Sequence, residues 1–82
     1  MNSDHEDRLR MLIKEVARRD ASALGRDDDL VETLAIDSLE GLQILAHVEK
    51  RFDVRLPDEE LIHMRTIGRI ADCIARLQQG GR

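Results

Sequence analysis

Apolar residues recur at the spacing of an α-helix in the first part of the chain. They fall at positions i, i+3, i+4 and i+7, on one face of a helix: Leu9, Leu12, Ile13 and Val16. Ser3 and Glu6 have the spacing of a capping box, in which each side chain accepts a hydrogen bond from the backbone of the other residue. The pattern predicts a helix that begins near residue 4 and ends near Asp20.

A second helical pattern begins at Asp37. Asp37 and Glu40 have the N-cap and N3 spacing of another capping box. The stripe that follows is expected to consist of Leu42, Leu45, Val48 (or Glu49) and Phe52. Asp53 and Pro57 end this helix, because a proline disfavours helical geometry in the residue before it.

Two further helical segments follow Pro57. Residues 58–61 predict a short helical turn with acidic side chains at its positive end. Thr66 is a good N-cap for a last helix. The stripe of that helix is Ile67, Ile70, Ala71, Ile74 and Leu77, and residues 78–82 are expected to be a frayed tail.

The segment between the first two helices, residues 21–36, has no sustained period. We expect it to be a loop that Leu30, Leu34 and Ile36 hold against the core. No stretch shows the alternation of a strand. The sequence therefore predicts an all-α fold: a four-helix bundle of three main helices and one short helix, with a long loop between helices one and two. Residues 1–82 are expected to form a single domain, with its core over about residues 4–78.

Composition narrows the possible functions. The formal charge is −4 and Phe52 is the only aromatic residue, which argues against binding to nucleic acid. The single cysteine, Cys73, excludes an internal disulfide and is expected to be a small buried residue. The first ten residues lack the apolar region of a secretory signal, and no apolar run has membrane-spanning length. We expect a cytoplasmic protein.

Negative charge is concentrated between residues 27 and 40. This stretch carries six acidic side chains and no lysine or arginine. Such a field favours a partner with a basic face. A solvated acidic loop explains the same pattern.

Ser38 is the candidate for chemistry. It directly follows Asp37 at a helix N-terminus, and its hydroxyl is expected to be exposed because the apolar stripe faces elsewhere. Unpaired N–H groups and a partial positive charge make such a position favourable for a phosphate ester. The histidines are scattered and form no catalytic set with Ser38. We therefore expect that this protein is not an enzyme and has no metal site, and that another enzyme modifies Ser38.

Residues 34–40 read Leu-Ala-Ile-Asp-Ser-Leu-Glu, which resembles the acyl carrier protein motif with its central Asp-Ser-Leu. Residues 49–53, residues 56–60 and the Thr66-Ile67 pair follow in the order and spacing of that family. The resemblance covers about residues 4–78. It implies a four-helix bundle that carries a prosthetic group.

The group implied by the resemblance is a covalent 4′-phosphopantetheine, derived from coenzyme A, on Ser38, with Asp37 and Leu39 beside it. Its thiol carries acyl or aminoacyl cargo as a thioester. The implied partners are a phosphopantetheinyl transferase and a loading ligase, synthase or transferase. We expect a monomer that binds neither nucleic acid nor a membrane.

Docking in this family uses helix two, the loop before it and the short third helix. The matching candidates here are Glu40, Leu42, Gln43, His47, Lys50, Asp58 and Glu59. Two alternatives stay open: Leu39 and Leu42 are either core residues or contacts for the arm and partners, and His47 is either a solvated side chain or a recognition contact.

The second helix departs from the acidic pattern common in carriers of primary fatty acid synthesis. Gln43, Lys50 and Arg51 stand where acids are common, and Ala35 replaces a usual glycine. These departures favour a dedicated carrier for a specialised pathway. The alternative function is a helical interaction or regulatory domain of the same fold without the arm.

Overall fold

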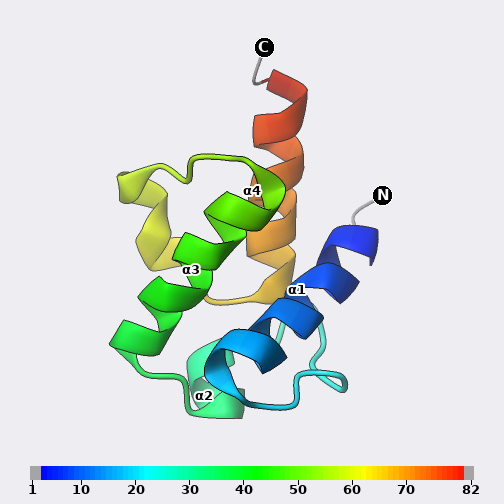
Figure 1. Ribbon diagram of the computed structural model, residues 1–82, viewed down its shortest axis with the longest axis vertical. Helices are drawn as coiled ribbons and strands as arrows, with labels where there is room; N and C mark the ends of the chain where they lie inside the picture. The colour runs from blue at the N-terminus through cyan, green and yellow to red at the C-terminus, as the bar shows by residue number, and fades with distance from the viewer. Residues whose placement is uncertain (1–2, 81–82) are drawn as a thin grey trace.

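The chain folds into helices joined by loops (Figure 1). This structure is a computed structural model, and it describes residues 3–80. In chain order the elements are α1 (Ser3–Ala17), α2 (Leu30–Leu34), α3 (Ser38–Phe52), the 3-10 helix η1 (Asp58–His63) and α4 (Ile67–Gly80). Within residues 3–80 no strand forms, and an isolated antiparallel bridge joins Asp29 to Thr66. The predicted all-α fold is confirmed.

The three long helices enclose one apolar core. α1 packs against both α3 and α4, and their apolar faces supply most of the buried side chains. The most deeply buried of them are Leu9, Leu12, Ile13, Ile44, Val48, Ile67, Ile70, Ala71, Cys73 and Ile74. Helices of this length are marginal alone in water, so the shared apolar face is what stabilises them. Thr66 caps α4 as expected, because its Oγ1 accepts a hydrogen bond from the Arg69 N–H at 3.1 Å.

The segment predicted as an unbroken loop, residues 21–36, contains the short helix α2. Asp29 is its N-cap, and the Asp29 carboxylate accepts hydrogen bonds from the N–H groups of Val31 and Glu32. Leu30 anchors the helix in the core, and its N–H donates to the Arg65 carbonyl at 2.8 Å. Ala35 ends the helix in the left-handed conformation. Five residues are too few to show a helical period, so the pattern of the sequence missed this element.

The boundaries of α1 differ slightly from the expected ones. The helix ends at Ala17, before the expected end near Asp20, because Arg18 takes a left-handed conformation with φ 61°. The predicted capping box rests on Ser3, whose side chain lies outside the described residues. The Glu6 carboxylate forms an ion pair with Arg26 at 3.3 Å.

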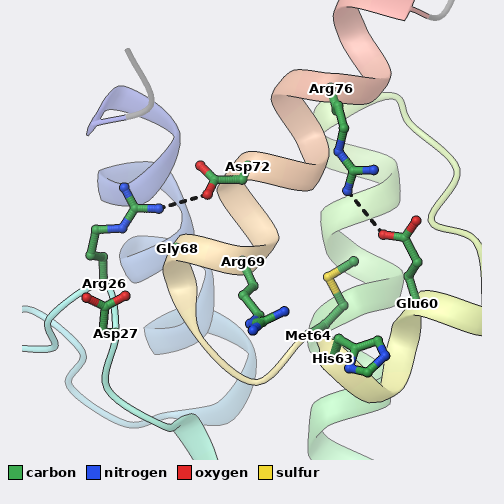
Figure 2. A pocket seen from close by; sticks show the side chains of 9 residues that line it. All are labelled: Arg26, Asp27, Glu60, His63, Met64, Gly68, Arg69, Asp72 and Arg76. Atoms are coloured by element: carbon green, nitrogen blue, oxygen red, sulfur yellow. Dashed lines mark hydrogen bonds and ion pairs between the residues drawn. The ribbon is translucent and has the colours of Figure 1, made fainter.

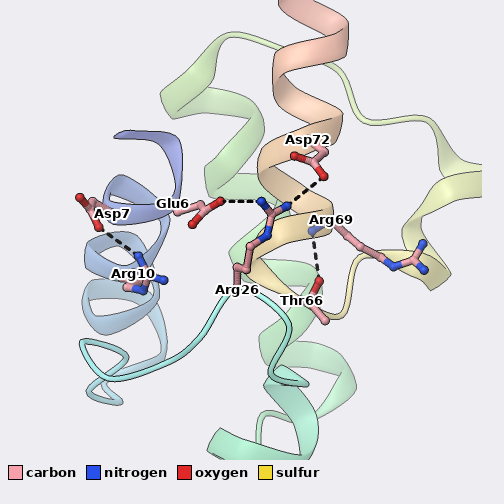
Figure 3. Close-up of polar contacts among 7 residues, drawn as sticks. All are labelled: Glu6, Asp7, Arg10, Arg26, Thr66, Arg69 and Asp72. Carbon is pink, nitrogen blue, oxygen red and sulfur yellow. Dashed lines mark hydrogen bonds and ion pairs between the residues drawn. The ribbon is translucent and has the colours of Figure 1, made fainter. Parts of the chain in front are cut away.

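Arg26 fastens the long loop to two helices. Figure 3 shows its guanidinium between Glu6 of α1 and Asp72 of α4, and the distance to Asp72 is 3.0 Å. The Arg26 carbonyl also accepts a hydrogen bond from the Gly68 N–H at 2.8 Å. A Cβ at position 68 would lie 2.7 Å from Arg26 Nε and 3.0 Å from the Arg26 carbonyl oxygen. The absence of a side chain at Gly68 therefore permits this attachment.

We expect Gly68→Ala to lower the free energy of unfolding by about 1–3 kcal/mol, because the new methyl group displaces Arg26 from its two ion pairs. Gly41→Ala in α3 is the matched control. A Cβ there meets nothing within 4 Å, so this change should raise the free energy of unfolding by up to about 1 kcal/mol. Urea unfolding followed by circular dichroism measures both. Equal stabilisation by the two substitutions would contradict the role given to Arg26.

Candidate functional site

Ser38 is the first residue of α3, and its side chain is exposed. The predicted capping box holds this turn. Asp37 Oδ1 accepts a hydrogen bond from the Glu40 N–H at 2.8 Å, and Glu40 Oε1 accepts one from the Asp37 N–H at 3.3 Å. Asp37 is itself extended, with φ −86° and ψ 177°, so the chain turns sharply into the helix at this residue. The Ser38 hydroxyl is thus presented to solvent from a fixed turn.

This arrangement suits the attachment of an anionic group to the Ser38 hydroxyl. The N-terminus of α3 carries partial positive charge and free backbone donors, which favour a phosphate ester. Within residues 3–80 no hydrogen bond joins a histidine to Ser38. His47 Nδ1 lies 2.8 Å from the Gln43 carbonyl, His5 Nε2 lies 3.1 Å from Gln78 Oε1, and His63 belongs to η1.

An apolar groove begins beside Ser38 and runs between α2, α3 and η1. Its volume is about 500 Å³, within the range of roughly 300–1,000 Å³ that is typical of small-molecule sites. The lining includes the exposed side chains of Leu42 and Ile62 and the buried side chains of Ile44 and Met64. The Ser38 hydroxyl therefore lies where a polar helix end meets an apolar surface.

Comparison with known proteins shows the family to which this chain belongs. Residues 7–74 match the family model described as a phosphopantetheine attachment site. The acyl carrier protein of Rhodococcus erythropolis is 34% identical over 73 residues, which cover 89% of this chain and 80% of that relative. The chain belongs to the acyl carrier protein family.

Other relatives agree with this assignment. An acyl carrier protein of an Arthrobacter species is 33% identical over 70 residues, covering 85% of this chain and 86% of the relative. The meromycolate extension acyl carrier protein of Mycobacterium leprae is 32% identical over 68 residues, covering 83% of this chain and 59% of the relative. These relatives are carriers, not catalysts, and the matches do not favour an arm-free interaction domain.

The prosthetic group of this family is a covalent 4′-phosphopantetheine, which supplies a thiol for cargo. The residues present fit such a group. Ser38 offers an exposed hydroxyl at a helix N-terminus, and the groove that it helps to line is largely apolar. Asp37 and Gly41 also line the groove at its Ser38 end.

Leu39 and Leu42, whose role the sequence left undecided, lie on the surface of this carrier. Leu39 is 65% exposed and Leu42 is 56% exposed, so neither belongs to the core. The predicted stripe of α3 was wrong at Leu42, because the buried face of this helix is turned toward Ile44, Leu45, Val48 and Phe52. Leu42 faces the groove instead.

The remaining docking candidates lie on two elements. Gln43, His47 and Lys50 are exposed at positions of α3 that share one face by helical spacing. Asp58 and Glu59 are exposed in the first turn of η1, whose Leu61 and Ile62 line the groove. Glu40 is different from the others because it is only partly exposed and contacts Arg19.

Several charges of α3 are engaged within the molecule. Glu40 pairs with Arg19 at 2.8 Å, and Arg51 pairs with Glu15 at 2.6 Å. Glu49 Oε2 accepts a hydrogen bond from the Leu56 N–H at 2.7 Å. Among residues 3–80 no hydrogen bond or ion pair involves the Lys50 ammonium, so the charge that this helix presents most openly is positive. Sequence reasoning did not find these long-range contacts.

A second cleft, of about 330 Å³, lies on another part of the surface (Figure 2). It is polar, and its charges are largely paired: Arg26 with Asp72, and Arg76 with Glu60. Met64 lines both this cleft and the groove beside Ser38. The cleft does not include Ser38 and has no apolar lining comparable to that of the groove.

Two further observations concern membrane crossing and metal binding. None of the helices within residues 3–80 is long and apolar enough to cross a bilayer. Over the same residues, no three side chains of histidine, cysteine, aspartate or glutamate gather into a possible metal site.

The one protein thiol is shielded. Cys73 is 1% exposed, as expected from its position in α4. Burial, with the neighbouring Glu60 carboxylate as a smaller cause, raises the pKa of the Cys73 thiol above its usual value. Both effects keep Cys73 in its unreactive thiol form. A thiol on a prosthetic arm therefore has no reactive competitor in the described part of the chain.

We expect Cys73 of the unmodified protein to react with an aromatic disulfide reagent at pH 8 at least about tenfold more slowly in the folded than in the urea-unfolded state, because reaction requires local opening of α4. Release of the coloured thiolate, followed by absorbance, measures both rates. Equal rates in the two states would contradict the burial of this side chain.

Proposed function

We propose that Ser38 is the attachment site of the phosphopantetheine arm. The observation that carries the proposal is an exposed hydroxyl in the first turn of α3, at the end of an apolar groove. Ser22 is also exposed but lies in a turn outside any helix, so it lacks the N-terminal donors and the groove. Asp37 holds the turn through its hydrogen bond to the Glu40 N–H.

The groove supports an apolar acyl cargo over an aminoacyl one. Asp37 is the only acidic side chain of its lining and Arg65 the only basic one, and Arg65 is already paired with Asp29 at 2.9 Å. A charged or strongly polar cargo would leave its polar groups without partners against such a surface, at a cost in free energy. An alkyl chain instead covers exposed Leu42 and Ile62 and removes their apolar area from water.

The partners proposed here are a phosphopantetheinyl transferase and the enzymes that load and unload the arm. Their docking surface comprises the exposed face of α3 and the start of η1. The apolar contacts are Leu39 and Leu42, and the polar contacts are Gln43, His47, Lys50, Asp58 and Glu59. An arrangement of apolar centre and polar edge is common in specific protein interfaces.

We also propose that the carrier serves a specialised pathway. An acidic second helix suits partners with a basic face. The corresponding helix here is α3, which has no net charge and presents the ammonium of Lys50. A basic partner face meets a like charge at this point, which disfavours association. The name of the Mycobacterium leprae relative, meromycolate extension acyl carrier protein, is consistent with such a division of labour within the family.

Ser38→Ala should abolish modification by a phosphopantetheinyl transferase and coenzyme A, while helical circular dichroism and melting temperature stay nearly unchanged. The changed side chain is exposed and lies outside the core, which is why the fold should persist. Intact-mass spectrometry detects the added arm. Ser22→Ala is the matched control and should gain the arm at the wild-type rate. A Ser38→Ala protein that still gains this mass would refute the site.

Lys50→Glu should increase loading by a malonyl transferase of primary fatty acid synthesis, mostly through a faster association rate, because a like-charge contact becomes an attractive one. The control is Lys14→Glu on α1, which makes the same charge change at the other lysine of the chain and should have little effect. Loading is measured on the phosphopantetheinylated protein by mass. If the wild type is already loaded as fast as a housekeeping carrier, the specialised pathway loses its support.

A further inference from the structure

The ion pair between Arg19 and Glu40 joins the end of α1 to the start of α3. Arg19 Nη1 donates to Glu40 Oε2 at 2.8 Å and to the Ala17 carbonyl, at the last residue of α1, at 3.1 Å. The other oxygen of the same carboxylate, Oε1, accepts the hydrogen bond from the Asp37 N–H. Both oxygens of Glu40 therefore have a partner inside the molecule.

Burial adds to this engagement. The side chains of Arg19 and Glu40 are 34% and 27% exposed, so solvent and salt screen the pair less than they screen a pair on the open surface. A guanidinium this close cancels most of the field of the carboxylate at longer range. A basic partner that approaches Ser38 thus meets little of the charge that the sequence places at position 40.

We propose that Arg19 is a specificity-determining residue that masks Glu40 from partner enzymes. This inference rests on the proposed function, since it concerns the enzymes that dock around Ser38. Arg65 acts in the same way on Asp29, and its hydrogen bond to that carboxylate lowers the pKa of Asp29. Two of the six acidic side chains between residues 27 and 40 are therefore neutralised by arginines from other segments.

The masking changes which acids steer a partner. Within residues 3–80 no ion pair involves the other four acids, which are Asp27, Asp28, Glu32 and Asp37. Their negative charge is therefore available to attract a basic partner. Glu40 is a latent contact: it lies two residues after Ser38, but it becomes available only when Arg19 is removed. Partner enzymes with basic faces therefore bind this carrier with a lower affinity than its sequence alone suggests.

A double-mutant cycle on the complete chain tests this proposal. The variants are Arg19→Gln, Glu40→Gln and the two combined, and the measured quantity is kcat/KM for modification by a phosphopantetheinyl transferase at low and high salt. Glutamine at position 40 still provides an acceptor for the Asp37 N–H, so the capping box is kept. Thermal melting of each variant reports any loss of stability separately.

We expect Glu40→Gln to leave kcat/KM nearly unchanged in the wild-type background. In the Arg19→Gln background the same change should lower kcat/KM roughly two- to fivefold at low salt, which is the effect of one exposed charge contact. Arg19→Gln alone should raise kcat/KM and make it fall more steeply with salt. Arg19→Lys keeps the cation and should behave as the wild type.

Arg18→Gln is the matched control, because it removes the same charge from an exposed neighbour that has no ion pair in the described part of the chain. If Arg18→Gln raises kcat/KM as much as Arg19→Gln, net charge and not masking is responsible, and the proposal is overturned. An equal effect of Glu40→Gln in both backgrounds, including no effect in either, also overturns it. A wild type that gains no arm refutes the proposed function instead.

Discussion

The reciprocal hydrogen bonds between Asp37 and Glu40 fix the first turn of α3, and the presentation of Ser38 depends on them. Without these bonds the first N–H groups of the helix would have only water as partners, and the turn would fray. An N-cap side chain typically contributes about 0.5–2 kcal/mol, a large share of what holds a single exposed turn. The Glu40 carboxylate also pairs with Arg19, which lies two residues after the end of α1.

The position of the groove follows from how little of the short elements is buried. α1, α3 and α4 bury full apolar faces against one another, whereas α2 buries Leu30 and η1 buries no side chain completely. The side of the molecule next to Ser38 is therefore closed by elements with few core contacts. Such elements open at a lower cost in free energy than the central helices, which suits the proposed role of the groove in receiving and releasing cargo.

Much of this arrangement could be predicted from the sequence because it rests on short-range patterns. The Asp37–Glu40 capping box and the Thr66 cap involve residues three apart, and both are confirmed. Leu42 was misplaced because an apolar stripe on α3 can be drawn through either Leu42 or Ile44, and the sequence alone does not distinguish the two.

The features that could not be predicted from the sequence depend on contacts between distant residues or on very short segments. The Arg19–Glu40 pair joins positions 21 residues apart, and the Arg26 attachment joins the loop to α1 and α4. The groove has no local signal at all, since its lining comes from four elements.

Peptide mapping of the modified protein tests the central claim most directly. Trypsin cleaves after Arg26 and Lys50, and the fragment between them contains two hydroxyl side chains, those of Thr33 and Ser38. Tandem mass spectrometry of this fragment should place a phosphopantetheinyl group on Ser38. A group found on Thr33, or on a fragment that contains Ser22, would contradict the account.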